Sequence, residues 1–132
     1  MNIQKFTQKS LEAVEGCEKL AMEYGNQEIE QEHLLYSLLT LDDSLILKLV
    51  ERMEIQKEHF LNRVEQALEK RVKVQGGKPY VGQYLNKTLI TAEDEAKRLG
   101  DEYVSVEHLF LAMLKNPSKT MAELFKEYGI TA

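Results

Sequence analysis

Apolar residues recur at intervals of three and four positions along most of the 132-residue chain. One early run contains Leu11, Val14, Cys17 and Ala21. A later run, over residues 85–99, follows the same period. This spacing places apolar side chains on one face of an α-helix, and no segment shows the sustained two-residue alternation of a half-buried strand. The pattern therefore predicts an all-α chain without a sheet.

Residues suited to helix ends divide this pattern into short helices. Thr7 is a suitable N-cap for the first helix, and Gly25 and Gly100 stand where a left-handed residue commonly ends a helix. A second helix is expected from residues 30–31, with a counterpart from Ser105 and residue 106. A third is expected from Asp43 and, in its counterpart, from Ser118. A fourth is expected over about residues 56–71.

The chain contains an internal repeat. A shift of 75 positions aligns residues 14–57 with residues 89–132 without a gap. Nine aligned pairs are identical, where about three are expected by chance, and apolar residues also face apolar residues. The identical pairs are Glu18/Glu93, Ala21/Ala96, Gly25/Gly100, Glu32/Glu107, His33/His108, Leu34/Leu109, Leu39/Leu114, Leu49/Leu124 and Ile55/Ile130. The chain is therefore predicted to be a tandem duplication.

The length and the linker fix the expected domain organisation. A chain of this size forms one domain, here residues 1–132. Three glycines and a proline between residues 76 and 82 predict a loop over 72–82, between repeat one (about 1–71) and repeat two (about 83–132). The second repeat stops two residues after Ile130, where the first continues into its fourth helix. The last helix is therefore expected to be truncated.

Composition excludes several classes of protein. Apolar residues make up 43% of the chain, enough for a packed core, and the net charge of −5 argues against a dedicated nucleic-acid binder. No apolar run approaches the roughly 18 residues of a membrane span, and the polar N-terminus lacks the features of a secretory signal. A single cysteine, Cys17, cannot form an internal disulfide, which favours a cytoplasmic protein.

The sequence offers little catalytic chemistry. The three histidines lack metal-site spacing, and two of them, His33 and His108, occupy equivalent repeat positions, which favours hydrogen-bonded imidazoles over metal ligands. No glycine-rich loop of a nucleotide site is present. The basic residues of the linker, Arg71, Lys73 and Lys78, are interpreted as a solvated loop rather than a phosphate site. We expect no catalytic residues, no metal and no cofactor in this chain.

The repeated element has a familiar form. NQEIEQEHLLYSLL in the first copy and GDEYVSVEHLFLAML in the second resemble the N-terminal domain of the Clp family of AAA+ unfoldases. The joining segment is most similar to that of the disaggregase chaperones of the ClpB type. The resemblance covers essentially the whole chain and implies two four-helix units related by pseudo-two-fold symmetry. Gln31 departs from the family pattern, in which a proline is common at this position, and this difference affects little.

The resemblance also implies a biological setting. The parent protein would be a cytoplasmic homohexamer whose downstream modules bind ATP and Mg²⁺. It would act with a DnaK-type chaperone system and thread unfolded or aggregated polypeptides through its pore. The isolated domain would be a monomer that captures such polypeptides, without binding nucleic acid or membranes.

The resemblance suggests an apolar substrate groove between the repeats with polar residues at its edge. The matching polar positions are Thr7, Asp101 and Glu107. Each also has a structural interpretation: Thr7 as an N-cap, Asp101 as a loop residue after a helix, and Glu107 as a first-turn partner of the helix dipole. Apolar candidates for the groove wall are Leu11, Tyr84, Leu85 and Tyr103.

Two alternatives to a disaggregase module remain at this point. The chain could be the equivalent domain of a protease-associated Clp ATPase of the ClpC or ClpA type, which docks adaptor proteins. It could also be an independent small enzyme or regulator, although the absence of catalytic motifs argues against that.

Overall fold

The computed structural model describes residues 3–132 as a mostly helical chain. A short 3-10 helix, η1 (Ile3–Lys5), precedes α1 (Gln8–Glu23). The remaining elements are β1 (Glu28–Ile29), α2 (Gln31–Leu39), α3 (Leu45–Arg52), α4 (Lys57–Glu69), β2 (Tyr80–Val81), α5 (Gln83–Arg98), α6 (Val106–Lys115) and α7 (Lys119–Tyr128). The predicted helical fold class is confirmed.

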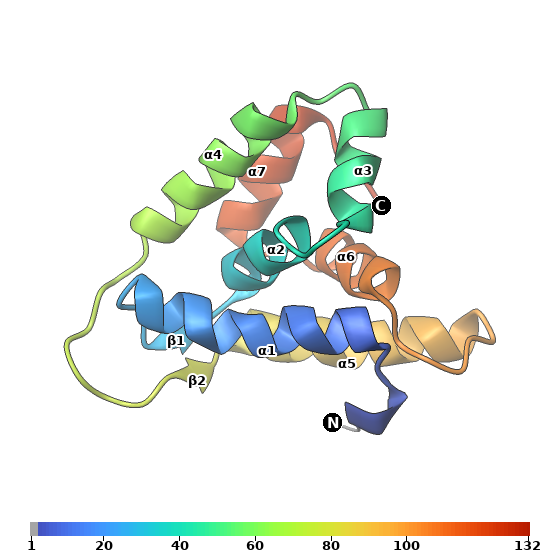
Figure 1. Cartoon of the computed structure of the whole chain (residues 1–132), viewed down its shortest axis with the longest axis horizontal. Helices are drawn as coiled ribbons and strands as arrows, with labels where there is room; N and C mark the ends of the chain where they lie inside the picture. Colours follow the sequence, from blue (N-terminus) through green and yellow to red (C-terminus); the bar gives the residue numbers. More distant parts are fainter. Residues whose placement is uncertain (1–2) are drawn as a thin grey trace.

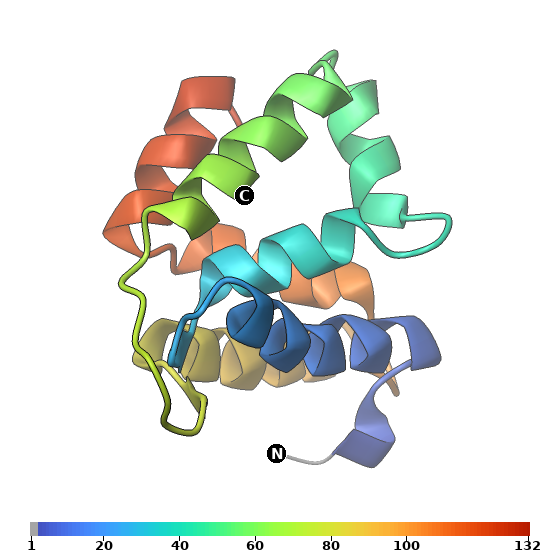
Figure 2. The ribbon, with the colours of Figure 1, turned by 60° about the vertical axis from the view of Figure 1, so that its left-hand side comes forward.

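The helices form layers around a central pair. Helices α1 and α5 run side by side along one side of the molecule, α2 and α6 lie in the middle, and α3, α4 and α7 form the other side (Figures 1 and 2). Helix α1 packs mainly on α2, and α5 packs mainly on α6. Each outer helix of the first layer therefore covers the central helix of its own half.

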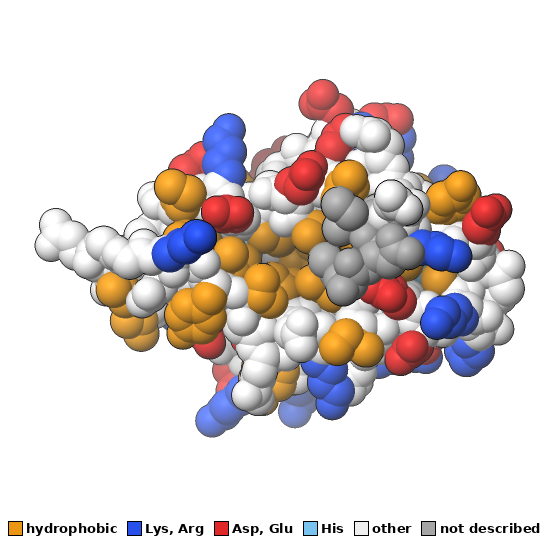
Figure 3. All heavy atoms as spheres, turned by 90° about the horizontal axis from the view of Figure 1, so that it is seen from below, with side chains coloured by type: hydrophobic (Ala, Val, Ile, Leu, Met, Phe, Trp, Pro, Cys, Tyr) orange, Lys and Arg blue, Asp and Glu red, His pale blue; other side chains and the backbone are white. Residues whose placement is uncertain are grey.

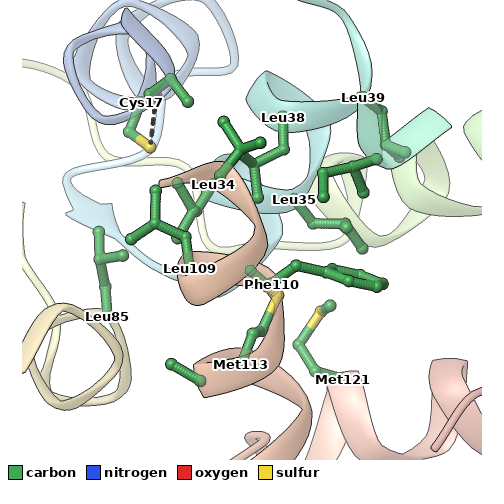
Figure 4. Packing of buried hydrophobic residues seen from close by; sticks show 14 of the residues in the cluster. Cys17, Leu34, Leu35, Leu38, Leu39, Leu85, Leu109, Phe110, Met113 and Met121 are labelled. Carbon is green, nitrogen blue, oxygen red and sulfur yellow. Dashed lines mark hydrogen bonds between the residues drawn. The ribbon is translucent and has the colours of Figure 1, made fainter. Parts of the chain in front are cut away.

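The core lies around α2 and α6. Leu34, Leu35 and Leu38 are fully buried, and so are their repeat partners Leu109 and Met113. Figure 4 shows these side chains pointing toward one another from the two central helices. Fully burying a leucine side chain contributes about 1.5–3 kcal/mol, so this paired cluster holds the two halves together.

Matched hydrogen bonds relate the two halves. The Asn26 N–H donates to the Ala21 carbonyl at 2.8 Å, and 75 residues later the Asp101 N–H donates to the Ala96 carbonyl at 2.8 Å. The preceding residues, Gly25 and Gly100, have φ angles of +70° and +76°, the left-handed conformation expected there. These equivalent turns agree with the pseudo-two-fold symmetry implied by the resemblance.

The expectation of no sheet is wrong in one detail. Strands β1 and β2 form a two-residue parallel pair, with Glu28 opposite Tyr80 and Ile29 opposite Val81. Its repeat counterpart is a single bridge between Phe6 and Val104. Such pairs are too short to produce a period of two in the sequence, and each one joins segments that are far apart in the chain.

Helix boundaries differ from the sequence expectations by one or two residues. The third helix begins after Ser44, whose hydroxyl caps it, because Asp43 takes a φ of +55° outside the helix. The expected fourth helix is confirmed as α4 but ends at Glu69 rather than near residue 71. No counterpart of α4 lies among residues 3–132.

Candidate polypeptide-binding site

An apolar hollow lies where the two halves meet at the start of α1. We call it the seam pocket, and its volume is about 400 Å³. The start of α1, the turn before α3, the start of α3 and the start of α6 all contribute to it. Its wall consists of the apolar residues Leu38, Leu41, Leu45, Ile46 and Val106, and its rim of Thr7, Gln8, Lys9, Asp42, Asp43, Ser44, Ser105 and Glu107.

Thr7 is held at the seam by contacts in both directions. Its Oγ1 accepts a hydrogen bond from the Ser10 N–H at 3.2 Å, which confirms its predicted role as N-cap. Its own N–H donates to the Val104 carbonyl of the second half at 2.9 Å. The Ser10 hydroxyl donates to that same carbonyl at 2.7 Å. Thr7 therefore fixes the start of α1 against the other repeat.

Glu107 also lines the seam pocket, in the first turn of α6. Its side chain is exposed and has no ion-pair or hydrogen-bond partner within residues 3–132. The position favours a negative charge because of the helix dipole. Thr7 and Glu107, one hundred residues apart in the sequence, thus share one pocket rim, and the carboxylate is free to meet a ligand.

A second hollow adjoins the seam pocket and shares Ser105 and Glu107 with it. We call it the end pocket, and its volume is about 490 Å³. Its other residues are Leu99, Asp101, Glu102, Tyr103, His108 and Leu111. The Tyr103 side chain is 49% exposed and that of Leu99 is 52% exposed. The end pocket therefore combines exposed apolar groups with acidic ones.

Asp101 is positioned by His108. The His108 Nδ1 accepts the Ser105 N–H at 2.9 Å, so the proton of the neutral ring is on Nε2, which donates to the Asp101 carboxylate at 2.9 Å. In the first half, His33 makes the same pair of bonds, to the Glu30 N–H and to the Asn26 amide oxygen. The prediction of hydrogen-bonded imidazoles at these two positions is confirmed.

The remaining predicted groove residues lie elsewhere. Tyr84 is exposed, but it lies at the beginning of α5, which is the opposite end of that helix from Asp101. Leu11 is partly buried and packs against the core. Leu85 is only 2% exposed, because the helical period places it on the inward face of α5, so it cannot line an open surface.

Figure 3 shows a further apolar area on the face formed by α1 and α5. Hydrophobic side chains gather in a strip along the middle of this face. The exposed apolar residues of these two helices include Met22, Tyr84 and Ile90. None of these three residues lines the seam pocket or the end pocket.

The first half carries a buried ionic cluster that the sequence interpretation missed. Arg71 donates from Nη1 to the Glu32 carboxylate at 2.8 Å and from Nη2 to the Glu28 carboxylate at 2.7 Å. The Glu32 side chain is only 3% exposed. The interpretation of Arg71 as part of a solvated basic loop is therefore wrong, because its guanidinium folds back onto the E-H-L element and its side chain is only 18% exposed.

Glu30 joins this cluster and caps the opposite half. Its carboxylate accepts the N–H groups of Tyr84 at 3.1 Å and Leu85 at 2.7 Å, in the first turn of α5. Burial raises the pKa of the Glu30 carboxyl, and these two N–H donors oppose that shift. Gly82 is the N-cap residue of α5. A glycine is suited to this position because a Cβ there would overlap the Glu30 carboxylate.

The apolar wall of the seam pocket was also missed. Leu41 and Leu45 flank the turn between α2 and α3, where Leu41 is half-buried and Leu45 is exposed. Two leucines on either side of a short polar turn, Asp42 to Ser44, are the one sequence signal that could have indicated an open apolar surface there.

Chemical reactivity is suppressed at the buried titratable groups. Burial raises the pKa of the Cys17 thiol to about 12, which is the opposite of what a nucleophilic thiolate requires. Burial, together with the nearby Arg71 charge, lowers the pKa of His33 to about 4. Over the described part of the chain, no group of three or more His, Cys, Asp or Glu side chains is arranged to hold a metal ion. Among those same residues, no helix is long and apolar enough to cross a membrane.

Comparison with known families identifies the fold. The family model described as the Clp repeat (R) N-terminal domain matches residues 5–128. The chain belongs to this family. The resemblance inferred from the repeated E-H-L element is therefore confirmed.

Several proteins similar to this chain are ClpB chaperones. The chain is 37% identical to the chaperone protein ClpB of Nitratidesulfovibrio vulgaris, covering 99% of this chain and 16% of that protein. It is also 37% identical to ClpB of Porphyromonas gingivalis, covering 99% of this chain and 15% of that protein. The chain thus spans about one-sixth of the length of these relatives.

Solved structures of Clp N-terminal domains share the fold. The Hsp104 N-terminal domain from Candida albicans has a TM-score of 0.81 at 23% identity, covering 96% of this chain and 83% of that one. A ClpV N-domain in complex with a VipB peptide has a TM-score of 0.73 at 23% identity, covering 94% of this chain and 79% of that one.

Proposed function

We propose that this Clp N-terminal domain captures unfolded or aggregated polypeptides for an ATP-dependent disaggregase of the ClpB type. The observation that carries the proposal is the seam pocket, an open apolar hollow between the repeats with Thr7 and Glu107 on its rim. The ClpV N-domain bound to a VipB peptide supports a peptide-binding role for the fold.

The seam pocket suits weak capture of apolar segments. Leu45 is 40% exposed at its wall and offers an anchor for one or two apolar side chains of an extended polypeptide. A pocket of this size with so few anchors corresponds to a Kd on the order of micromolar or weaker, about −8 kcal/mol at best. Weak binding allows each captured segment to be released to the translocating machine.

The parent protein would supply the energy-dependent steps. We propose a cytoplasmic homohexamer whose downstream modules bind ATP and Mg²⁺ and which works with a DnaK-type chaperone system. The domain, residues 1–132, would contribute binding without catalysis and would be monomeric when isolated. Six copies on one hexamer would raise the effective concentration of binding sites and offset the weakness of each.

Docking of adaptor proteins is the second candidate function. The N-terminal domain of ClpD, a caseinolytic protease associated chaperone from Arabidopsis thaliana, shares the fold with a TM-score of 0.75 at 16% identity. An adaptor is a folded protein, so this function predicts binding to a folded partner and no binding to an unfolded chain.

Titration of the isolated domain with an unfolded, apolar-rich polypeptide, followed by NMR, tests the proposal. Chemical shift changes should cluster on Thr7, Leu45 and Glu107, and the Leu45→Ser variant should bind at least fivefold more weakly because it removes the exposed wall. The Thr7→Ala/Glu107→Ala double variant should also weaken binding, with the fold checked by circular dichroism because Thr7 is an N-cap.

The matched control is Ile90→Ser, which removes a similarly exposed apolar side chain from α5 outside the seam pocket. It should leave the affinity unchanged. The proposal fails if the shifts map to residues 72–81, or if Leu45→Ser binds as well as the unaltered domain.

A further inference from the structure

The linker between the two repeats follows the first half closely and loops away from it in the middle. The Val74 N–H donates to the Gly25 carbonyl at 2.9 Å. The Tyr80 N–H donates to the Gln27 carbonyl at 2.9 Å. The two acceptors are close neighbours in the chain, whereas several linker residues separate the two donors. Residues 75–79 therefore loop out from the surface.

The linker and the start of α5 carry a large share of the exposed apolar side chains. Among residues 3–132, eleven large apolar side chains are exposed, and five of them lie within residues 72–84. We call these five the linker patch: Val72, Val74, Tyr80, Val81 and Tyr84. Single exposed apolar residues are common, whereas a group of them indicates an interaction surface.

The linker patch borders an open hollow. The hollow has a volume of about 540 Å³, lies between α4, α7 and the linker, and is lined by Val72, Val74 and Tyr80. Tyr84 lines an adjoining hollow, which shares Arg71 with the first. No residue of the patch lines the seam pocket or the end pocket. In Figure 1, β2 lies at the lower left, whereas the C-terminus lies beside α3 on the right.

The sequence around the patch is basic, although the chain as a whole is acidic. Residues 70–92 contain five lysine or arginine residues, and all 22 acidic residues of the chain lie outside this stretch. Lys73 is engaged by the Glu69 carboxylate at 3.6 Å. Lys70 and Lys78 are exposed and have no ion-pair partner among residues 3–132. These two ammonium groups are therefore available to an acidic partner.

Most carboxylates next to the patch are already bound within the domain. Glu28 and Glu32 both pair with Arg71. Glu30 is buried and accepts two backbone N–H groups of α5. Glu123, on the α7 side of the hollow, is exposed and has no ion-pair partner in the described part of the chain. A partner therefore meets free lysines at the linker and one opposing carboxylate on α7.

Strand β2 also offers backbone groups to a partner. The N–H groups of Tyr80 and Gly82 both donate to the first half. Because the hydrogen-bonding groups of successive strand residues point to opposite sides, the N–H and C=O of Val81 are directed away from β1. Pro79 has no N–H, so this open edge is short. A neighbouring extended segment can exchange a pair of hydrogen bonds with Val81.

We propose that the linker patch docks an extended segment of another protein, rich in acidic residues and carrying apolar residues among them. Its apolar side chains would contact Val74 and Tyr80, its carboxylates would meet Lys70 and Lys78, and its backbone would pair with Val81. The seam pocket has an acidic residue on its rim and lies elsewhere, so this inference goes beyond the proposed capture of unfolded polypeptides.

Titration of the domain with the blocked peptide EIEVDE, followed by NMR, tests the inference. Chemical shift changes should cluster over residues 70–84. Lys78→Glu should weaken binding about tenfold, because it reverses a recognition charge, and Val81→Ser should weaken it at least threefold. Glu123→Gln should tighten binding, because it removes the opposing carboxylate. The matched control is Lys97→Glu, at the other end of α5, which should bind as the unaltered domain does.

Two further peptides separate the contributions of charge and apolar contact. KIKVKK keeps the apolar residues and reverses the charge, and ESESDE keeps the acidic character without apolar residues. Each should bind at least tenfold more weakly than EIEVDE. The inference is overturned if KIKVKK binds equally well, if EIEVDE shifts seam-pocket residues instead, or if Lys78→Glu leaves its affinity unchanged.

Sedimentation of the domain alone tests a different occupant. The domain should remain monomeric, and a dimer that Lys78→Glu dissociates would show that a second copy of this chain covers the patch, which overturns the inference. Lys78→Glu should leave capture of the apolar polypeptide unchanged, whereas Leu45→Ser should weaken that capture and leave EIEVDE binding intact. Failure at the linker patch is therefore distinguishable from failure at the seam pocket.

Discussion

The two E-H-L elements have matching backbones and opposite surroundings. In the first, Glu32 is buried beneath Arg71, and His33 bonds to a neutral amide. In the second, Glu107 is exposed and His108 bonds to the exposed carboxylate of Asp101. The repeat therefore duplicated a framework, and its two copies diverged into a closed structural cluster and an open acidic surface.

Position 31 shows the same divergence at the seam. The buried Gln31 side chain donates to the Thr88 hydroxyl and the Asn116 carbonyl, both at 2.9 Å, and accepts the Ser118 N–H at 2.9 Å. Its counterpart, Val106, lines the seam pocket. In the first copy, Gln31 acts as a polar clamp, because its hydrogen bonds join the two halves. In the second copy, the equivalent Val106 contributes an apolar side chain to the wall of the seam pocket.

The largest expected loss of stability follows from removal of Arg71, which pairs with the carboxylates of Glu28 and Glu32. Arg71→Ala leaves the buried Glu32 carboxylate without its ion-pair partner, so we expect the free energy of unfolding to fall by about 3 kcal/mol or more. Chemical denaturation measures this loss. Arg52→Ala, at an exposed position of α3, should change stability by no more than about 0.5 kcal/mol. A loss below about 1 kcal/mol for Arg71→Ala would show that the cluster is not structural.

The clamping role of Gln31 is tested by replacing it with valine, the residue found at the equivalent position 106. Gln31→Val removes three hydrogen bonds, one to the buried Thr88 and two to the half-buried Asn116 and Ser118, so we expect a loss of about 2 kcal/mol in the free energy of unfolding. The same substitution at Gln66, which is exposed on α4, should cost about 0.5 kcal/mol. Equal effects at the two positions would contradict a clamping role for Gln31.

The smallest expected effect, taken per pH unit, is the pH response of His33. Its pKa of about 4 lies below the unfolded value of about 6.5, so the unfolded chain binds more protons between these limits. The contribution of His33 to stability is complete above pH 6.5 and is lost as the pH falls toward 4, by at most about 1.4 kcal/mol per pH unit.

NMR titration of the imidazole is the direct measurement for His33. The raised pKa of Glu30 affects the stability curve in the opposite direction, so a stability measurement alone would mix the two groups. The His33 ring should remain neutral down to about pH 4. A midpoint near 6.5 would contradict the burial of this ring in a closed cluster.

Sequence alone determined the local framework of this protein. The three- and four-residue spacing of apolar positions, the caps at Thr7 and Ser105, and the glycines at 25 and 100 are local signals, because helix formation depends on residues within one or two turns. The repeat further indicated two equivalent units, and the E-H-L elements indicated the family. Thr7, Asp101 and Glu107 came from that resemblance.

Tertiary structure alone decided which surfaces are closed and which are open. It placed Arg71 on Glu32, put Leu85 in the core, and brought Thr7 and Glu107 to one rim with an apolar wall that includes Leu45. These outcomes depend on how helices cross and where the linker returns. Contacts between residues far apart in the chain leave no periodic trace, so the sequence could predict the two halves but not their different surfaces.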